Sequence, residues 1–204
     1  MSKEIRAFNF DIRTEHNDDK KYTLRGRPIV FNADTDMGYY TERISSNALD
    51  NTDLKDVRFL INHNTEMIPL ARSRNNNANS TMQMEVDAEG MNIRVELDVD
   101  NNAEAKALYS AIERGDISGM SFMFTVNSEE WSDVLSDKPT RTITEIGKVF
   151  EVSAVTFPAY SQTSIATRGL DDALESAKQT LESERTKARQ FELQKAKIKL
   201  KMEI

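Results

Sequence analysis

The strongest structural signal in the sequence is a pair of alternating segments joined by a short turn. Apolar residues alternate with polar ones over residues 82–86 and again over residues 91–97, with Asp87-Ala88-Glu89-Gly90 between them. A period of two places the apolar side chains on one face of a strand, so this region predicts a β-hairpin. Further strands are predicted over residues 5–12, 22–31, 57–61 and 120–126, and a second hairpin over residues 140–157 around Gly147. The chain therefore reads as mainly β.

One predicted helix stands directly before a strand. Residues 102–114 place alanine, leucine and isoleucine on one side at helical spacing, and Gly115 suits the C-terminal end of such a helix. The helix would therefore lead into the strand that carries Ser121. In that strand Met120 and Phe122 would face one way and Ser121 the other.

The character of the sequence changes at Arg168, which predicts a domain over residues 1–167 and a charged, helical tail over residues 168–204. Apolar residues of the tail lie near a heptad seam, interrupted by Glu184 and Lys195. The tail could serve association, or it could be a solvated helix that packs on its own domain. Its last residues also alternate with period two, so their secondary structure is open.

The composition excludes several kinds of site. Without cysteine there is no disulfide, no thiolate nucleophile and no sulfur-ligated zinc, and two histidines leave little for a nitrogen-rich metal site. We therefore expect neither a metal nor a cofactor. A net charge of −7 argues against nonspecific nucleic-acid binding. No stretch reaches the roughly 20 apolar residues of a membrane span, and no secretory signal is recognised, so we expect a cytoplasmic protein without a membrane partner.

Three residue types in the sequence are those of a serine hydrolase. A serine hydroxyl needs a base within hydrogen-bond reach, and the imidazole base needs an acceptor that fixes its tautomer. Ser121 at a strand start, His63 after the strand 57–61 and Glu151 at another strand start supply these types. Gly119 favours Ser121 because a glycine lets backbone amides approach an oxyanion. Ser118 and Ser153 are alternative nucleophiles, His63 could be a packed structural residue, and Glu151 could be a surface residue.

The order of several segments resembles the prohead maturation proteases of tailed phages, serine peptidases related to the herpesvirus assemblins. The similar segments are Gly26-Arg27-Pro28-Ile29-Val30-Phe31, residues 59–64, Ile68-Pro69-Leu70-Ala71-Arg72, residues 114–122 and residues 150–160. The resemblance implies an assemblin-like fold, namely a mostly antiparallel β-barrel with flanking helices (α+β), followed by the helical tail. It implies Ser121 as nucleophile, His63 as general base and Glu151 as the orienting member. Ala71 and Met123 stand where the family commonly has glycine, and Met123 could narrow the oxyanion site or the substrate cleft.

The resemblance also implies a place of action. The enzyme would be packed inside the assembling procapsid in the host bacterial cytoplasm, cleave the scaffolding segment of the major capsid protein, and then digest itself. An enzyme used in this way must stay inactive until assembly, so we expect a homo-oligomer, namely a dimer, that is activated by association or confinement. The alternatives are a catalytically idle internal scaffolding protein with the same fold, and a nonenzymatic β-barrel binding module.

Overall fold

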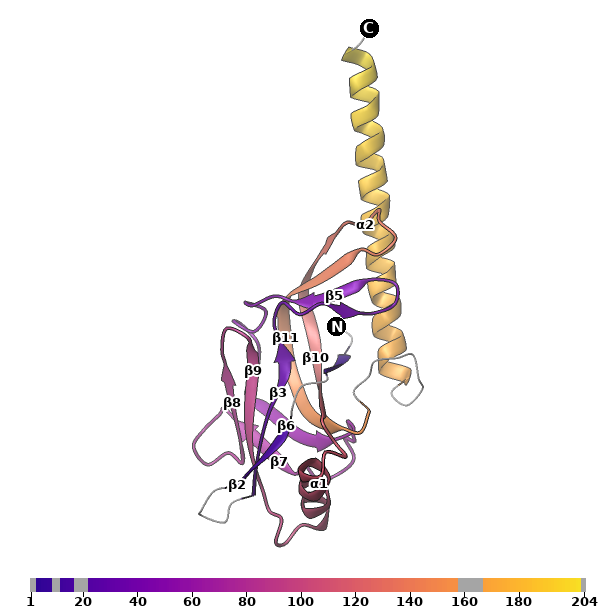
Figure 1. The fold of residues 1–204 in the computed structure, drawn as a ribbon. Coiled ribbons are helices and arrows are strands. Elements are labelled where there is room, and N and C mark those ends of the chain that lie inside the picture. The colour runs from indigo at the N-terminus through magenta and orange to yellow at the C-terminus, as the bar shows by residue number, and fades with distance from the viewer. Residues whose placement is uncertain (1–2, 9–11, 17–21, 158–166, 203–204) are drawn as a thin grey trace.

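The protein folds into two β-sheets and two helices over the residues that the computed structural model describes, namely 3–8, 12–16, 22–157 and 167–202 (Figure 1). The larger sheet consists of β1 (Lys3–Phe8), β4 (Thr35–Asp36), β5 (Thr41–Ile44), β6 (Asp56–Ile61), β7 (Ala71–Arg74), β10 (Gly119–Ser132) and β11 (Thr140–Val155). The smaller sheet consists of β2 (Arg13–His16), β3 (Tyr22–Val30), β8 (Met82–Val86) and β9 (Gly90–Leu97).

The long antiparallel pair β10–β11 forms the centre of the larger sheet. Strand β1 pairs antiparallel with the first half of β10, from Phe8 opposite Met120 to Lys3 opposite Thr125. On its other side β11 carries two parallel neighbours, β5 along its first part and β6 along its last part. Segments that lie far apart in the chain therefore meet at the C-terminal end of β11.

The hydrophobic core contains residues of both sheets and of the helix α1 (Ala103–Glu113). Its members include Leu24 and Met91 from the smaller sheet and Phe122 and Phe124 from the larger one. The last two rings stack with their centroids 4.6 Å apart. The mainly β class is thus confirmed. Neither sheet closes on itself over the described residues, so the expected barrel is not confirmed.

The predicted hairpin at residues 82–97 and the predicted helix are both confirmed. Strands β8 and β9 pair antiparallel, and Gly90 adopts φ +153°. The helix α1 begins after Asn102, whose side chain accepts hydrogen bonds from the backbone N–H groups of the first turn. After α1, Gly115 takes the left-handed conformation with φ +78°, which ends the helix and lets the chain enter β10.

Two predicted strands differ from the observed ones. The predicted strand 5–12 corresponds to β1 over residues 5–8, in the larger sheet, and its residues 9–11 lie outside the described residues. A separate strand, β2, follows at Arg13–His16 and pairs with β3 in the smaller sheet. The predicted hairpin around Gly147 is wrong, because β11 runs without a turn from Thr140 to Val155. Gly147 instead allows a close approach: a Cβ atom there would lie 2.3 Å from the side chain of Asn127.

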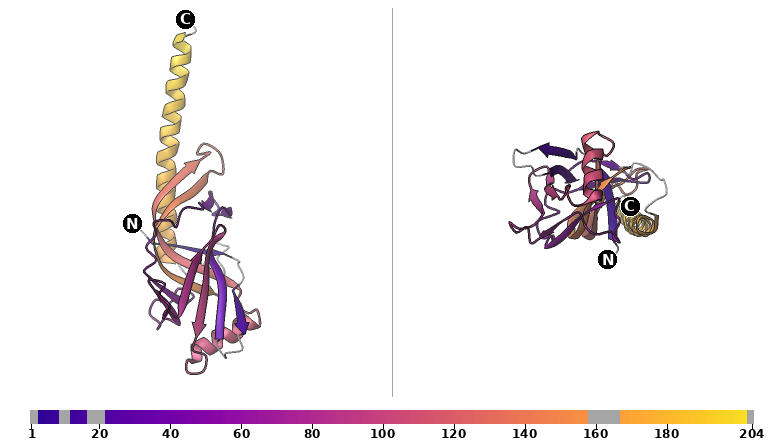
Figure 2. Two further views of the ribbon diagram at one scale, coloured as in Figure 1. Left: turned by 90° about the vertical axis from the view of Figure 1, so that its left-hand side faces the viewer. Right: turned by 90° about the horizontal axis from the view of Figure 1, so that it is seen from below.

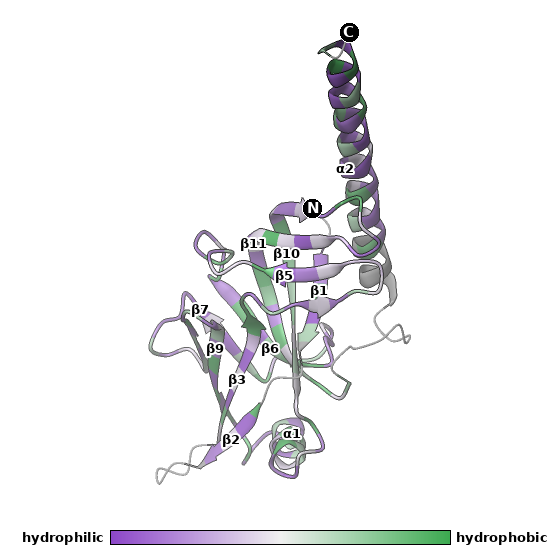
Figure 3. Cartoon of the chain, turned by 45° about the horizontal axis from the view of Figure 1, so that its top comes forward, coloured by the Kyte–Doolittle hydropathy of each residue, from purple (hydrophilic) through white to green (hydrophobic). Residues whose placement is uncertain are grey.

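The tail forms the helix α2 (Thr167–Met202), which packs on the body around residues 177–185. Ala177 and Leu181 are buried, and the Arg185 guanidinium donates to the backbone carbonyl of Val134 over 2.8 Å. Beyond this point the helix projects from the body, as the left-hand view of Figure 2 shows. Hydrophilic and hydrophobic residues are mixed along the projecting half (Figure 3), and its apolar side chains are exposed. Neither helix has the length and apolarity needed to cross a membrane, as far as the described residues go.

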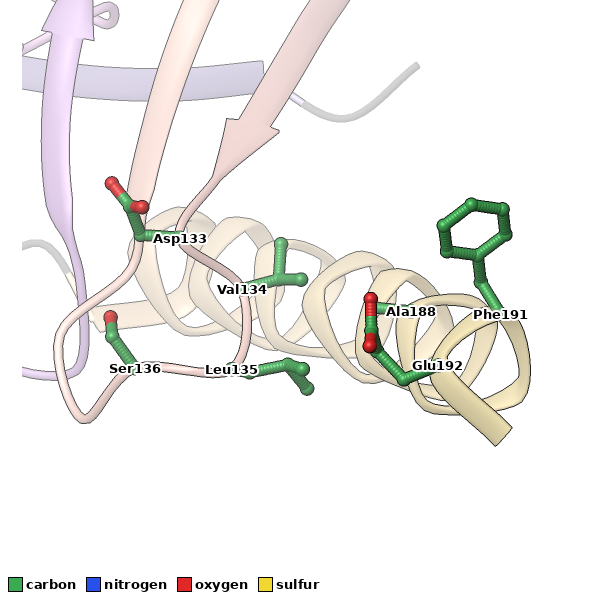
Figure 4. A pocket seen from close by; sticks show the side chains of 7 residues that line it. All are labelled: Asp133, Val134, Leu135, Ser136, Ala188, Phe191 and Glu192. Carbon is green, nitrogen blue, oxygen red and sulfur yellow. The ribbon is translucent and has the colours of Figure 1, made fainter. Parts of the chain in front are cut away.

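A shallow hollow of about 380 Å³ lies where α2 leaves the body. It is lined by the turn between β10 and β11 and by one face of the helix (Figure 4), with the residues Asp133, Val134, Leu135, Ser136, Ala188, Phe191 and Glu192. None of the three sequence-predicted site residues lines it.

Candidate active site

His63 lies in a turn that is fastened to the end of β11. Strand β6 ends at Ile61, and Asn62 and His63 both adopt positive φ angles, 50° and 57°. The Asn62 backbone N–H donates to the carbonyl of Ala154, and its side-chain amide exchanges two hydrogen bonds with Thr156, at 2.9 and 3.1 Å. Positive φ is uncommon for histidine, so these contacts hold a conformation that the isolated residue would disfavour.

Glu151 and His63 are in direct contact. The Nδ1 atom of the imidazole lies 2.5 Å from Oε1 of the carboxylate. Glu151 is only 2% exposed and His63 13%, so water screens this pair little. Strand β6 runs parallel to β11, with Arg58 opposite Glu151. The turn that follows β6 therefore folds back over β11 and brings His63 to the glutamate. The structure thus brings these two residues, both named from the sequence, together.

Ser153 joins the same group from two residues further along β11. Its Oγ lies 2.5 Å from Oε2 of Glu151, and the His63 backbone N–H donates to the same Oγ over 3.1 Å. The hydroxyl is fully buried. Ser153 therefore bridges the carboxylate and the backbone of the histidine.

Ser121 lies in the neighbouring strand, directly opposite Ser153. Strand register pairs Ser121 with Ser153 and Met123 with Glu151. Residues 120 and 122 enter the hydrophobic core, so Ser121 and Ser153 point to the other face of the sheet. Directly opposed residues have Cβ atoms roughly 4.5–5.5 Å apart. Ser121 thus lies beside the group formed by Glu151, Ser153 and His63.

The Ser121 hydroxyl is fully buried and donates to the backbone carbonyl of Arg6 over 2.8 Å. Arg6 belongs to β1, which pairs with the first half of β10. The proton of the hydroxyl is therefore directed to β1 and not to the imidazole in this conformation. Of the alternative serines, Ser118 is exposed just before β10, and the hydroxyl of Ser153 is engaged by Glu151.

Other residues named from the sequence take different positions. Met123 is half-buried and opposes Glu151, two residue pairs along from Ser121. Ala71 is buried opposite Phe59. The guanidinium of Arg72 binds both carboxylate oxygens of Asp56, at 2.6 and 2.9 Å.

The sequence interpretation treated Ser153 as a rival nucleophile and missed its bridging contacts. A signal was present, since Glu151 and Ser153 stand two apart in a strand and so share one face.

A cluster of buried charges holds β1 against β5 and β11. Arg6 and Arg141 lie between the carboxylates of Glu4 and Glu42, and Glu129 also binds Arg141. Arg141 donates to Glu4 and Glu42 over 2.8 Å each. The strand whose carbonyl accepts the Ser121 proton is therefore fixed by ionic contacts with two other strands.

The environment of this cluster shifts the pKa values of its members. Burial alone would raise the pKa of Glu4, but the hydrogen bond from Arg141 and the charges of both arginines outweigh burial and lower it. Burial would lower the pKa of Arg6, but the charge of Glu42 and its hydrogen bond raise it. Burial raises the pKa of Tyr40, which lies beside the cluster, to about 12. Within the described ranges, no group of three or more His, Cys, Asp or Glu side chains is placed to hold a metal ion.

Comparison with known protein families identifies a match. Residues 8–179 match the family described as caudovirus prohead serine protease. Neither the curated proteins nor the solved structures gave a match to the chain. The matched region contains Ser121, His63 and Glu151 and ends within α2. Because the match covers most of the 204 residues, the chain belongs to the caudovirus prohead serine protease family.

Proposed function

We propose that the protein is a serine endopeptidase in which Ser121 is the nucleophile, His63 the general base and Glu151 the residue that orients the base. The observation that carries this proposal is the 2.5 Å contact between His63 Nδ1 and Glu151 Oε1 beside the strand of Ser121. With Nδ1 engaged by a carboxylate, Nε2 is the nitrogen left to take a proton.

The proposed reaction follows from these roles. Ser121 Oγ attacks the carbonyl carbon of the scissile peptide bond while Nε2 of His63 takes its proton, which gives a tetrahedral oxyanion and an imidazolium stabilised by Glu151. The imidazolium then gives the proton to the leaving amine as the C–N bond breaks. The same imidazole then takes a proton from a water molecule as its oxygen attacks the acyl-enzyme, and the imidazolium gives this proton to Ser121 Oγ as the ester bond breaks. Backbone N–H groups near Gly119 would stabilise the oxyanion.

The hydrogen bond from Ser121 to the Arg6 carbonyl supports an unreactive resting state of the nucleophile. Attack requires the hydroxyl to leave the Arg6 carbonyl, and rotation about χ1 between staggered positions would achieve this. The buried position of Ser121 further requires that the face over it opens to admit a substrate. We propose that association of the protein, as a dimer or in the confinement of the procapsid, favours the open, reactive arrangement.

Family membership supports a role in phage maturation. We propose that the substrate is the scaffolding segment of the major capsid protein, that processing takes place inside the procapsid in the host cytoplasm, and that the enzyme also cleaves itself. We further propose an assemblin-like arrangement for residues 1–167 and a separate role for residues 168–204.

Co-expression with the capsid protein tests the function. Wild-type protein and the exposed-serine control Ser118→Ala should both process the capsid protein, whereas Ser121→Ala should assemble shells without processing. Unchanged processing by Ser121→Ala would show that Ser121 is not the nucleophile. Shells that form without processing even with the wild-type protein would show an idle scaffolding protein.

A further inference from the structure

Three hydrogen bonds connect His63, Ser153 and Glu151 in a closed ring. One bond runs from the His63 backbone N–H to Ser153 Oγ, the second joins that Oγ to Glu151 Oε2, and the third joins Glu151 Oε1 to His63 Nδ1. The ring thus holds both the backbone and the imidazole of one residue. That residue also has a positive φ angle of 57°.

The polarity of each bond in the ring follows from what each group can donate. A backbone N–H only donates, so Ser153 Oγ must accept from His63. The single proton of the Ser153 hydroxyl is then free to go to Glu151, and an ionised carboxylate accepts it. The other carboxylate oxygen accepts from Nδ1–H of the imidazole. The ring therefore selects the Nδ1–H tautomer and leaves Nε2 unprotonated.

We infer that Ser153 is a positioning residue of the active site, which fixes the tautomer and orientation of His63 through Glu151 and through the His63 backbone. This inference rests on the proposed function, in which His63 Nε2 is the base. Ser153 is fully buried, so water cannot replace its hydroxyl easily. The amide contacts of Asn62 with Thr156 support the same turn from its other side.

Without the Ser153 hydroxyl, two buried groups lose their partner. The His63 N–H would be left without an acceptor, and Glu151 Oε2 without this donor. Both losses weaken the position of the imidazole. A misplacement of about 1 Å can cost about 100-fold in rate, so Ser153→Ala should slow the reaction of Ser121 about 10- to 100-fold while the binding of the reactant changes little.

The test is NMR spectroscopy of the full-length protein labelled with ¹⁵N-histidine. The chain has two histidines, so His16→Gln in the same background identifies the signals of His63. Spectra are recorded about two pH units above the ordinary histidine pKa of about 6.5. Wild-type protein and Ser118→Ala should show His63 almost wholly as the Nδ1–H tautomer, and Ser153→Ala should show a mixture of both tautomers. A Ser153→Ala protein with unchanged His63 signals would overturn the inference.

Two further variants keep the test decisive. If Ser153→Ala does not fold, Ser153→Cys, which retains the shape of serine with a weaker donor, is judged by the same signals. Ser121→Ala separates this inference from the proposed function. If Ser121→Ala still processes capsid protein, the assignment of Ser121 fails, whereas the tautomer of His63 continues to report on Ser153 alone.

Reaction with a fluorophosphonate gives the second measurement. Ser153→Ala should lower the maximal labelling rate of Ser121 about 10- to 100-fold and leave the half-saturating probe concentration within about twofold. A residue that acts only through overall stability would instead reduce the fraction of protein that reacts.

Discussion

The hydroxyl of Ser121 donates its proton to the backbone carbonyl of Arg6 at a distance of 2.8 Å. Strand β1 therefore accepts the hydroxyl proton that a reactive serine would have to donate to its base. Because β1 is fixed to β5 and β11 by buried ion pairs, this contact is part of the fold and not of a loose terminus. It gives a physical reason for the proposed activation by association.

Activity should accordingly depend on protein concentration. If association favours release of the Ser121 hydroxyl, the specific labelling rate with a fluorophosphonate should fall as the protein is diluted through its association range. Analytical ultracentrifugation of the same samples gives that range. A specific rate that stays constant while dimers dissociate would contradict activation by association.

Replacement of Glu151 by glutamine should impair the reaction strongly. The amide cannot stabilise the imidazolium as a carboxylate does, and its NH₂ group competes with Ser153 and Nδ1 as a donor. We expect the labelling rate of Ser121 to fall about 10²- to 10⁴-fold. Glu130→Gln, at an exposed position of β10, is the matched control and should react like the wild type. Similar rates for Glu151→Gln and Glu130→Gln would exclude Glu151 from the site.

Met123 should limit the size of what reaches Ser121. Its side chain lies on the same face of β10 as Ser121 and opposes Glu151. Met123→Ala should therefore raise the labelling rate with a bulky fluorophosphonate about 10-fold or more, and leave the rate with a small one nearly unchanged. The half-buried position should limit the loss of stability to less than about 2 kcal/mol. Equal effects on both probes would show that Met123 does not select by size.

The buried charge cluster predicts a loss of stability in acid. The pKa of Glu4 is lowered in the folded state from its ordinary value of 4.5. The stabilisation by Glu4 is thus present above about pH 4.5 and is lost as the pH falls through the lower folded-state value. Glu4→Gln should cost about 1.5–3 kcal/mol near neutral pH, because charge-assisted hydrogen bonds are lost. It should also make unfolding less dependent on pH below 4.5.

Urea denaturation at a series of pH values measures both effects, with the exposed Glu130→Gln as control. A Glu4→Gln protein with the same acid dependence as the wild type would show that Glu4 does not couple protonation to folding.

Tyr40 should be replaceable by phenylalanine without loss of stability. Its hydroxyl is buried and has no hydrogen-bond partner among the described residues, while its ring packs edge-on against Trp131. Tyr40→Phe removes the unpaired hydroxyl and keeps the ring, so stability should be unchanged or higher by up to about 1 kcal/mol.

The pH dependence of Tyr40 has the opposite sign to that of Glu4. Burial raises the pKa of Tyr40 from 10.0 to about 12, so its contribution is present below pH 10 and is lost as the pH rises through about 12. Tyr40→Phe should remove this alkaline loss, and Tyr39→Phe, at an exposed tyrosine, should retain it. Thermal unfolding between about pH 9 and 12 distinguishes them.

Short sequence patterns predicted the helix and the hairpin, which are stabilised by interactions between residues close together in the chain. The hairpin at residues 82–97 follows from alternation and its turn, and the helix at residues 103–113 follows from its spacing and from Asn102 and Gly115 at its ends. The glycine at residue 147 could indicate either a turn or a close contact. In the structure it lies inside a strand and allows the side chain of Asn127 to approach closely.

Pairings between distant segments could not be predicted in this way. Glu4 and Arg6 of β1 are buried, because Arg141 and Glu42 from other strands neutralise them. Likewise, the contact of His63 with Glu151 depends on the parallel pairing of β6 with β11. The resemblance to a family, and not periodicity, selected these two residues.

Mass mapping of fluorophosphonate-labelled protein tests the central claim most directly. Wild-type protein from procapsids that process their capsid protein is treated with the probe and digested, and the modified residue is identified. The account predicts one adduct, on Ser121, that is absent when His63 is replaced by alanine. An adduct on Ser153, Ser118 or any other residue, or active protein with Ser121 unmodified, would contradict it.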